Sequence, residues 1–402
     1  MRILFIAMAS SIHTARWTNQ IADQGWDIHL FPSDRADIHP EMRNITIHDR
    51  LIRSVNVGKN VKQKKSLPWL FPDSADLANK VLSRLRDAEL ARWTTAQSQR
   101  LARLIDNIKP DIIHSLEMQL AGYLTLAAHE RLGDRFPTWI MTTWGSDIYL
   151  FGRLAEHAEK IKAVLSACDY FTCDCQRDVV LARTFGFKGE VLPVIPAAGR
   201  FDVERMRQFR QSEPTSARRL IVLKGYQDWA GRALVGLRAI ELSANLLKGY
   251  CVIIYSASKD VRIAAELVCH ATGIPIKIIP KSSHEDMLRL YGRARVSIGL
   301  SISDGAPTSM VEAMVMGSFP IQSCTACADE WIEDGKTGLI VPPEDPETIA
   351  AAIRRAVSDD SLVDRAAELN MQIARERLDY RLIQSQVIAM YEKVGAKSDH
   401  IR

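Results

Sequence analysis

Two carboxylates, Asp304 and Glu312, stand at a spacing that suits recognition of a sugar diol. The alternation of small and apolar residues over 296–302 predicts a buried strand, and residues 303–308 have turn chemistry. Residues 309–316 predict a helix with one apolar side. Such a corner presents unpaired N–H groups that attract anions, and Glu312, just over one turn into the helix, can reach a ribose or hexose diol there. The alternative is a plain strand-turn-helix in which Asp304 caps the helix and Glu312 is solvated.

The run 303–320 resembles the E-x7-E signature of the retaining GT-B glycosyltransferases of glycosyltransferase family 4, with Asp304 where the first glutamate usually stands. The resemblance implies that Glu312 holds the ribose hydroxyls of a nucleotide-sugar donor, and that Asp304 touches the donor sugar. It also implies that the diphosphate or sugar meets the turn and the first backbone amides of the helix, at Gly305, Thr308 and Ser309.

A second cluster of charge follows the strand predicted at 220–223. Lys224 and Gly225 open a glycine-containing turn, and Arg232 closes it before a predicted helix. Family members usually carry an arginine and a lysine here that clamp the donor diphosphate, and Tyr226 stands where that arginine would be. The resemblance implies that Lys224 and Arg232 stabilise the departing nucleoside diphosphate, which gains charge as the glycosidic bond breaks. The alternative for Lys224 is an ordinary surface residue.

The acceptor and sugar side is expected in the first half of the chain. The first loop, 9–13, contains Ser11 and His13 but lacks the glycines of a dinucleotide fingerprint, which disfavours NAD. By resemblance this loop faces the diphosphate and acceptor, although His13 could instead belong to a helix cap. Trp144 to Asp147 resembles the family's H-G-x-D segment, with Trp144 in place of the histidine usually assigned to the reacting sugar. Asp147 is either catalytic or a helix cap.

Two successive series of strands and helices must position these residues. They predict an α/β fold, in which two Rossmann-like, doubly wound domains face a cleft as in GT-B proteins. We expect an acceptor-binding domain at 1–197, a polar linker at 198–219 and a nucleotide-sugar-binding domain at 220–377. By resemblance, a C-terminal helix within 378–402 crosses back to the first domain, and residues 382–391 have the matching amphipathic pattern.

Composition and charge indicate how many domains the protein has and which partners and cofactors to expect. A chain of 402 residues that is 47% hydrophobic exceeds the size of one typical core. The net charge of +4 argues against a dedicated nucleic-acid partner. Seven dispersed cysteines fit a reducing cytoplasm, and the pairs Cys173/Cys175 and Cys324/Cys327 lack companions at zinc-module spacing. With no Asp-x-Asp at a predicted strand end, we expect neither a metal nor a cofactor besides the nucleotide-sugar substrate.

The segment 50–103 is basic and aromatic, which suits an anionic or lipid-linked acceptor or the inner face of an anionic membrane. A solvated loop and an ordinary helix with basic edges are the alternative. The first residues, MRILFIAM, predict a buried strand rather than a signal peptide, and no apolar run is long enough to cross a bilayer. We therefore expect a cytoplasmic protein with peripheral membrane contact.

The resemblance implies a metal-independent, retaining glycosyltransferase of the hexosyltransferase type. It would move a sugar from a nucleotide-diphosphate-sugar donor to a hydroxyl of a carbohydrate or lipid-linked acceptor, in cell-surface polysaccharide or glycolipid synthesis. The departures at Asp304, Trp144 and Tyr226 leave open a catalytically silent nucleotide-sugar-binding or scaffold protein. A nucleotide-sugar epimerase of the same fold is less favoured, because its expected carboxylate and histidine set is not visible in the sequence.

Overall fold

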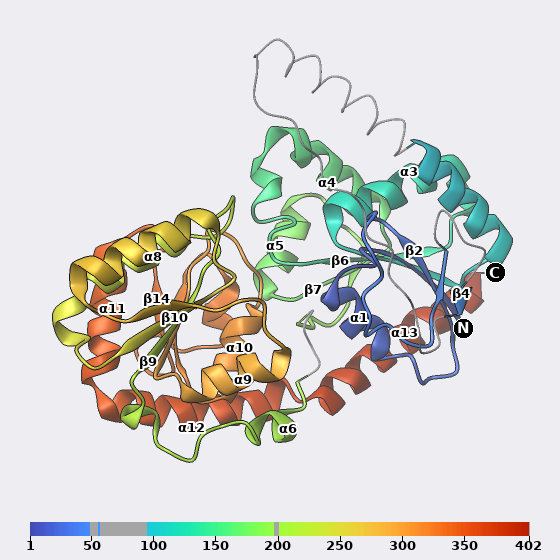
Figure 1. Cartoon of the computed structure of the whole chain (residues 1–402). Helices are drawn as coiled ribbons and strands as arrows, with labels where there is room; N and C mark the ends of the chain where they lie inside the picture. The colour runs from blue at the N-terminus through green and yellow to red at the C-terminus, as the bar shows by residue number, and fades with distance from the viewer. Residues whose placement is uncertain (49–54, 57–94, 197–200, 402) are drawn as a thin grey trace, which may run out of the picture.

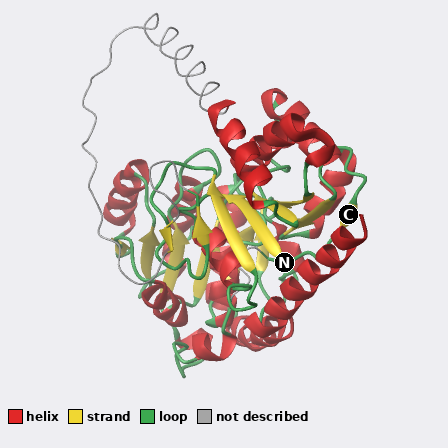
Figure 2. Cartoon of the chain, turned by 90° about the vertical axis from the view of Figure 1, so that its right-hand side faces the viewer, coloured by secondary structure: helices red, strands yellow, loops and turns green. Residues whose placement is uncertain are grey.

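The computed structural model of the protein describes residues 1–48, 55–56, 95–196 and 201–401, and these form two α/β domains (Figure 1). In each domain the strands lie inside and the helices outside (Figure 2). The predicted fold class, two Rossmann-like domains facing a cleft, is confirmed.

The first domain is built on an eight-stranded sheet in the order β4-β3-β2-β1-β5-β6-β7-β8, in which the β3–β4 pair is antiparallel and the other pairs are parallel. Its strands are β1 (Arg2–Ala7), β2 (Asp27–Pro32), β3 (Thr46–Ile47), β4 (Val55–Asn56), β5 (Ile112–Leu116), β6 (Thr138–Thr143), β7 (Tyr170–Cys173) and β8 (Glu190–Val191). Its helical segments are α1 (Ile12–Asn19), residues 95–108, the π-helix η1 (Met118–Gly122), α3 (Tyr123–Leu132), η2 (Gly133–Arg135), η3 (Phe151–Arg153), α4 (Ala155–Ala167) and α5 (Gln176–Thr184).

Alternation along β1 shows why this sheet is buried on both faces. Ile3 and Phe5 face a cluster that includes α1, whereas Leu4 and Ile6 face a cluster that includes α3 and α4. Strands with both faces covered read as continuous apolar runs, as β1 does.

The second domain has a six-stranded parallel sheet in the order β11-β10-β9-β12-β13-β14. Its strands are β9 (Leu220–Lys224), β10 (Cys251–Tyr255), β11 (Ile276–Ile278), β12 (Val296–Gly299), β13 (Phe319–Ser323) and β14 (Leu339–Val341). Its helices are α6 (Val203–Arg207), η4 (Thr215–Ala217), α7 (Ala233–Leu242), η5 (Ala244–Leu246), α8 (Lys259–Thr272), α9 (His284–Arg293), α10 (Thr308–Val315), η6 (Cys327–Glu330), α11 (Pro346–Ser358) and α12 (Asp360–Arg377). This is the doubly wound order, whose direction reverses between β9 and β12, and ligands bind at the carboxyl ends of the strands beside that reversal.

The segment that composition suggested as a linker packs, from Phe201 onward, with the second domain. Phe201, Val203 and Met206 are buried in the same apolar cluster as α10. The guanidinium of Arg218, also buried, donates hydrogen bonds to the carbonyls of Ala294 and Met316. Polar composition misled the prediction here because a few spaced apolar residues are enough to bury one side of a short helix.

The final helix, α13 (Tyr380–Ile401), runs back along the first domain, as the resemblance implied (Figure 1). Its apolar residues join the cluster that contains α1 and β1; they are Ile383, Val387, Met390, Tyr391 and Val394. The hydroxyl of Tyr391 lies 2.9 Å from Trp17 Nε1 and 2.6 Å from His114 Nδ1. The C-terminal helix is therefore part of the first domain's core.

Most of the basic segment 50–103 lies outside the described residues, so its predicted contact with a membrane or an anionic acceptor stays a prediction. Among the residues that are described, no helix combines the length and the apolar character needed to span a bilayer.

Candidate active site

A cavity of about 520 Å³ lies between the domains, next to the reversal of strand order in the second sheet. It is bounded by α1 and the loop after β6 on one side, and by the ends of β9 and β10 and the start of α10 on the other. Of the predicted site residues, those that line it are His13, Trp144, Lys224, Asp304, Thr308, Ser309 and Glu312. The structure thus brings the carboxylate pair, one of the two predicted cations and two residues of the first domain around a single space.

The mouth of α10 opens into this cavity. Its N-cap residue is Pro307, which makes no side-chain cap, so the first-turn N–H groups can receive an anion. Glu312 is only 7% exposed, and its Oε1 lies 2.8 Å from Nε2 of His284 at the start of α9. The alternative of a capping Asp304 and a solvated Glu312 does not fit this geometry.

Lys224 and Asp304 face each other at the same mouth, with Lys224 Nζ 3.7 Å from Asp304 Oδ2. Burial is the largest single influence on Lys224 and lowers the pKa of its ammonium, but Asp304, together with Tyr255, Tyr226 and Asp228, raises that pKa above its usual value. The ring of Tyr226 lies 4.6 Å from Lys224 Nζ. A fixed positive charge therefore stands beside the free amides of α10, where a diphosphate can contact both.

Arg232, the second predicted cation, does not line the cavity. It precedes α7, and its guanidinium pairs with Glu344 at 2.9 Å and donates to the carbonyl of Gly231. Gly225 has a clear steric reason to lack a side chain, because a Cβ there would lie 2.7 Å from the carbonyl oxygen of Tyr255. It allows the turn after β9 to pass close to β10.

On the first-domain side, the rings of His13 and Trp144 lie side by side, with centroids 5.5 Å apart. Burial, and then the positive charge of Arg16, lowers the pKa of His13 to about 4, so its imidazole is neutral at physiological pH. Neither His13 Nδ1 nor Trp144 Nε1 has a hydrogen-bond partner among the described residues. Ser11 is the N-cap of α1, and its hydroxyl accepts from the backbone N–H of His13 at 3.1 Å, so it orients His13 rather than lining the cavity.

Asp147 lies behind the cavity wall. Its Oδ2 accepts hydrogen bonds from the backbone N–H groups of Trp144 at 2.8 Å and Met118 at 3.2 Å. Burial, and then the nearby carboxylate of Glu117, raises the pKa of Asp147 well above its usual value. The geometry matches neither of the two roles left open for this residue, catalysis or a cap on the helix that follows, and instead these bonds hold Trp144 in place.

Several lining residues were not predicted. Asp174, directly after β7, accepts from the backbone N–H of Ala306 in the second domain at 3.3 Å. Burial, and then the carboxylate of Asp178, raises the pKa of Asp174 to about 8. Tyr255, at the end of β10, shares a hydroxyl hydrogen bond of 3.0 Å with Tyr291. Asp174 and Tyr255 both stand at the carboxyl ends of parallel strands, and that position in the sequence could have identified them as site residues.

Close contact between two loops joins the domains beside the cavity. Gly145 and Gly305 meet so closely that a Cβ on Gly145 would lie 1.9 Å from the backbone nitrogen of Gly305. Beside them, the hydroxyls of Ser146 and Ser303 are 3.0 Å apart. The described arrangement is therefore a closed one, in which the Trp144 loop touches the Asp304 turn.

The two doubly wound domains and the cavity between them define the GT-B class of fold. Residues 2–64 and 80–175 match the family described as "Glycosyl transferase 4-like", and residues 265–373 match "Glycosyl transferases group 1". The chain belongs to the glycosyltransferases of this family-4-like group.

One curated relative is the D-inositol 3-phosphate glycosyltransferase of a Nocardioides species, 28% identical over 104 residues. That match spans 26% of this chain and only 23% of the relative.

Solved structures share the fold over nearly the whole chain. Sucrose-phosphate synthase of Thermosynechococcus elongatus has a TM-score of 0.67 at 15% identity, covering 99% of this chain and 100% of that one. Anabaena HepE, solved in complex with UDP-glucose, has a TM-score of 0.67 at 13% identity, covering 98% and 100%. A UDP-forming trehalose-phosphate synthase of Burkholderia xenovorans has a TM-score of 0.69 at 14% identity, covering 98% and 99%.

Proposed function

We propose that the protein transfers a hexose-type sugar from a nucleotide-diphosphate-sugar donor to a hydroxyl acceptor, with retention of anomeric configuration. The observation that carries the proposal is the convergence of Glu312, Lys224, Asp304 and the open mouth of α10 on one cavity between two doubly wound domains. The UDP-glucose bound by Anabaena HepE, which shares the fold, supports a nucleotide-sugar donor.

The donor half of the cavity has the charges that this reaction needs. Glu312, oriented by His284, would accept hydrogen bonds from two ribose hydroxyls, and the diphosphate would lie between Lys224 and the α10 amides. When the bond from the anomeric carbon to the diphosphate breaks, these groups stabilise the new negative charge. The acceptor oxygen bonds to that carbon, and its proton passes to the departing phosphate oxygen. Since Lys224 and the helix supply positive charge, this step needs no metal ion.

The acceptor half faces residues of both domains. Arg16 on α1 and Lys281 before α9 line the cavity and add positive charge on this side, which favours an acceptor that carries negative charge, such as a phosphorylated carbohydrate or a lipid-linked diphosphate. The same proposal places the protein in the cytoplasm, where it would contact the membrane through residues 50–103. Its product would serve the synthesis of cell-surface polysaccharide or glycolipid.

The donor assignment is tested by substituting Glu312. We expect the purified protein to release a nucleoside diphosphate from one member of a nucleotide-sugar panel, and Glu312→Ala to weaken binding of that donor by about 10- to 100-fold, because a charge-assisted hydrogen bond is worth about 1.5–3 kcal/mol. Titration calorimetry measures the affinity. Glu285→Ala is the matched control, since this carboxylate follows His284 on α9 but pairs with Arg205 outside the cavity. Equal donor affinity in Glu312→Ala and the wild type would contradict the assignment.

A second candidate is a silent nucleotide-sugar-binding protein, because the three departures from the family pattern, Trp144, Tyr226 and Asp304, all line the cavity. It predicts tight donor binding with no release of nucleoside diphosphate in the presence of any acceptor. Release above the rate without enzyme excludes it. The anomeric signal of the product in NMR then distinguishes retention from inversion.

A further inference from the structure

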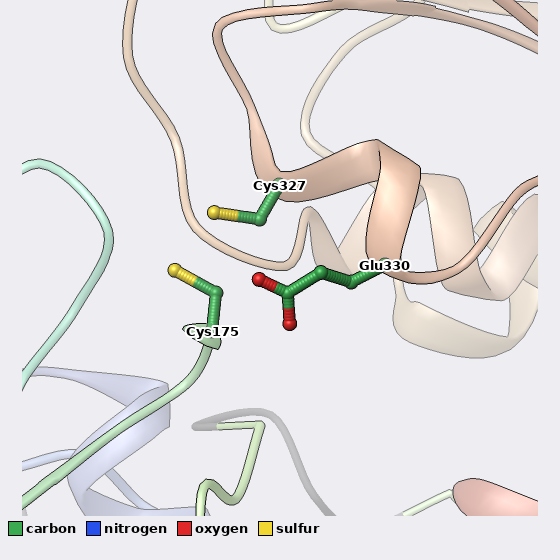
Figure 3. Close-up of side chains that lie close together, drawn as sticks. All are labelled: Cys175, Cys327 and Glu330. Atoms are coloured by element: carbon green, nitrogen blue, oxygen red, sulfur yellow. The ribbon is translucent and has the colours of Figure 1, made fainter. Parts of the chain in front are cut away.

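A cluster of metal-binding residue types bridges the domains beside the cavity, and none of its three members lines the cavity (Figure 3). Cys175 is the N-cap residue of α5 in the first domain, whereas Cys327 and Glu330 begin and end η6 in the second. Their side chains point toward one another in Figure 3, and the two sulfurs and one carboxylate oxygen all lie within 4.8 Å of one another. Both cysteines are buried, with exposures of 0% and 2%.

We propose that Cys175, Cys327 and Glu330 bind one zinc ion between the two domains. Zn–S bonds are about 2.3 Å and Zn–O bonds about 2.1 Å, so the ligand atoms of one tetrahedral zinc stand roughly 3.5–3.8 Å apart. The three ligand atoms lie within 4.8 Å of one another, so side-chain rotations that shorten their separations by about 1 Å would bring them to that spacing. Two thiolates and a carboxylate suit Zn²⁺ better than Mg²⁺ or Ca²⁺, which prefer oxygen ligands, and a water molecule completes the tetrahedron.

Hydrogen bonds from neighbouring residues orient the proposed ligands, as is usual around a metal ion. One carboxylate oxygen of Glu330 accepts from the backbone N–H of Gln176 at 2.7 Å, which orients the other oxygen. Arg177 donates to Asp178 at 3.0 Å and to the carbonyl of Thr325 at 3.1 Å. On binding, both thiols lose their protons to solvent, so the ligands carry three negative charges against two on zinc, and Arg177, which also pairs with Asp178, lies beside them.

Two other uses of the cysteines explain less. Buried cysteines often serve as small apolar groups, but that role does not account for a carboxylate placed beside both sulfurs. A disulfide would need an oxidant, which zinc binding does not, and it would leave the Glu330 carboxylate without a part in the cluster. Zinc can instead enter while the domains are apart, because each domain carries its own ligands.

Zinc bound here would hold the domains together. The ion would tie the start of α5 to η6, on the same interface where Gly145 meets Gly305. A ligand that binds only the closed form stabilises it by mass action. The site would therefore set how often the cleft opens, without touching the reacting atoms.

The test measures metal directly in the full-length protein. We expect elemental analysis after growth with zinc to find one zinc per chain. Replacement by Co²⁺ should give a thiolate-to-cobalt charge-transfer band and tetrahedral d–d bands. Cys175→Ser and Cys327→Ser should each lower zinc affinity by more than about 100-fold, and Glu330→Gln by about 10- to 100-fold.

The matched control is Cys324→Ser, an exposed cysteine three positions before Cys327, which should keep wild-type zinc content and the cobalt bands. Thermal unfolding of each variant shows whether it is folded, and the wild-type measurement stands even where a variant is not. Wild-type protein without zinc and without a cobalt–thiolate band overturns the proposal, as does a Cys175–Cys327 disulfide in non-reducing peptide mapping. Neither result bears on donor binding by Glu312.

Discussion

His114 lies in the middle of the first domain with a complete set of partners. Its Nδ1 is 2.6 Å from the Tyr391 hydroxyl and its Nε2 is 2.5 Å from Thr142 Oγ1. The set is satisfied when Tyr391 donates to Nδ1 and the Nε2–H donates to Thr142, a tautomer assigned from the network. Burial lowers the pKa of His114 to about 3, so the folded protein holds this ring neutral.

This neutral histidine makes stability depend on pH. Because the unfolded chain binds a proton at His114 near pH 6.5 and the folded chain only near pH 3, stability is lost as the pH falls between those values. We expect His114→Gln to reduce the slope of unfolding free energy between pH 5 and 6 by up to about 1.4 kcal/mol per pH unit. Denaturant unfolding at a series of pH values measures the slope. His270→Gln, at an exposed position near the end of α8, should leave it unchanged; an equal slope in His114→Gln and the wild type would contradict this account.

The site residues differ in how far sequence could predict them. Glu312 and Lys224 could be predicted as site residues, because they follow predicted strands and match the family's motifs. His284 lies 28 positions before its partner Glu312, and Cys175 lies far from Cys327 in the chain, so no local spacing could pair them. Arg232 was misplaced because sequence shows that a cation follows a glycine turn but not which way its side chain leaves the backbone.

At the scale of elements, the contact between the Trp144 loop and the Asp304 turn depends on two glycines. Gly145 has φ +56, and Gly305 is in turn pressed against Asp174, since a Cβ on it would lie 2.1 Å from Asp174 Oδ2. A side chain on Gly145 would collide with the backbone of the Asp304 turn, whereas one on Gly305 would displace the side chain of Asp174. Closure of the cleft at this point is therefore a main-chain contact between loops of different domains.

A methyl group at Gly145 should hold the cleft slightly open. We expect Gly145→Ala to lower kcat by roughly 100-fold, because a displacement of about 1 Å at the reacting groups has that effect. Donor affinity should stay within about threefold of wild type, since the donor contacts lie in the second domain. Steady-state kinetics and donor titration measure the two quantities.

Gly133→Ala separates closure from backbone strain. Gly133 has φ +55, nearly the value at Gly145, but a Cβ there meets nothing within 4 Å. It should unfold at a lower temperature and keep wild-type kcat. Equal loss of kcat in both variants would show that strain, not the contact between loops, causes the effect.

The helices and strands were predictable where periodicity is strong, as in β1 and α5. Residues 201–219 were not, because their few apolar residues show a buried side only when the second domain is present to cover it. The strand β8 covers only Glu190–Val191, although the chain stays beside β7 beyond it, where the backbone N–H of Ile195 donates to the carbonyl of Cys173 at 2.9 Å.

For the whole molecule, α13 joins the chain's end to the first domain's core. The Tyr391 hydroxyl accepts from Trp17 Nε1–H at 2.9 Å and bonds His114, so one side chain satisfies two buried groups. We expect Tyr391→Phe to lower the free energy of unfolding by about 1–3 kcal/mol, the usual cost of buried polar groups left without partners. Denaturant unfolding measures it. Tyr380→Phe removes a hydroxyl that accepts from the exposed Arg381 and should change stability by less than about 0.5 kcal/mol; a comparable loss in both variants would contradict the prediction.

The two connections between the domains lie together. The backbone N–H of Tyr380 donates to the carbonyl of Phe201 at 2.9 Å, and Phe201 pairs with Asp379 as a bridge. Because the two connections are adjacent, we expect the domains to rotate relative to one another mainly about a single hinge at this point. Glu312, Lys224 and the α10 amides all belong to the second domain, so the proposed donor site is complete whether the cleft is open or closed. The proposed acceptor site takes residues from both domains, so it forms only when the cleft closes. Substrate binding should therefore be ordered, donor first, and initial-rate kinetics with a product inhibitor would reveal that order.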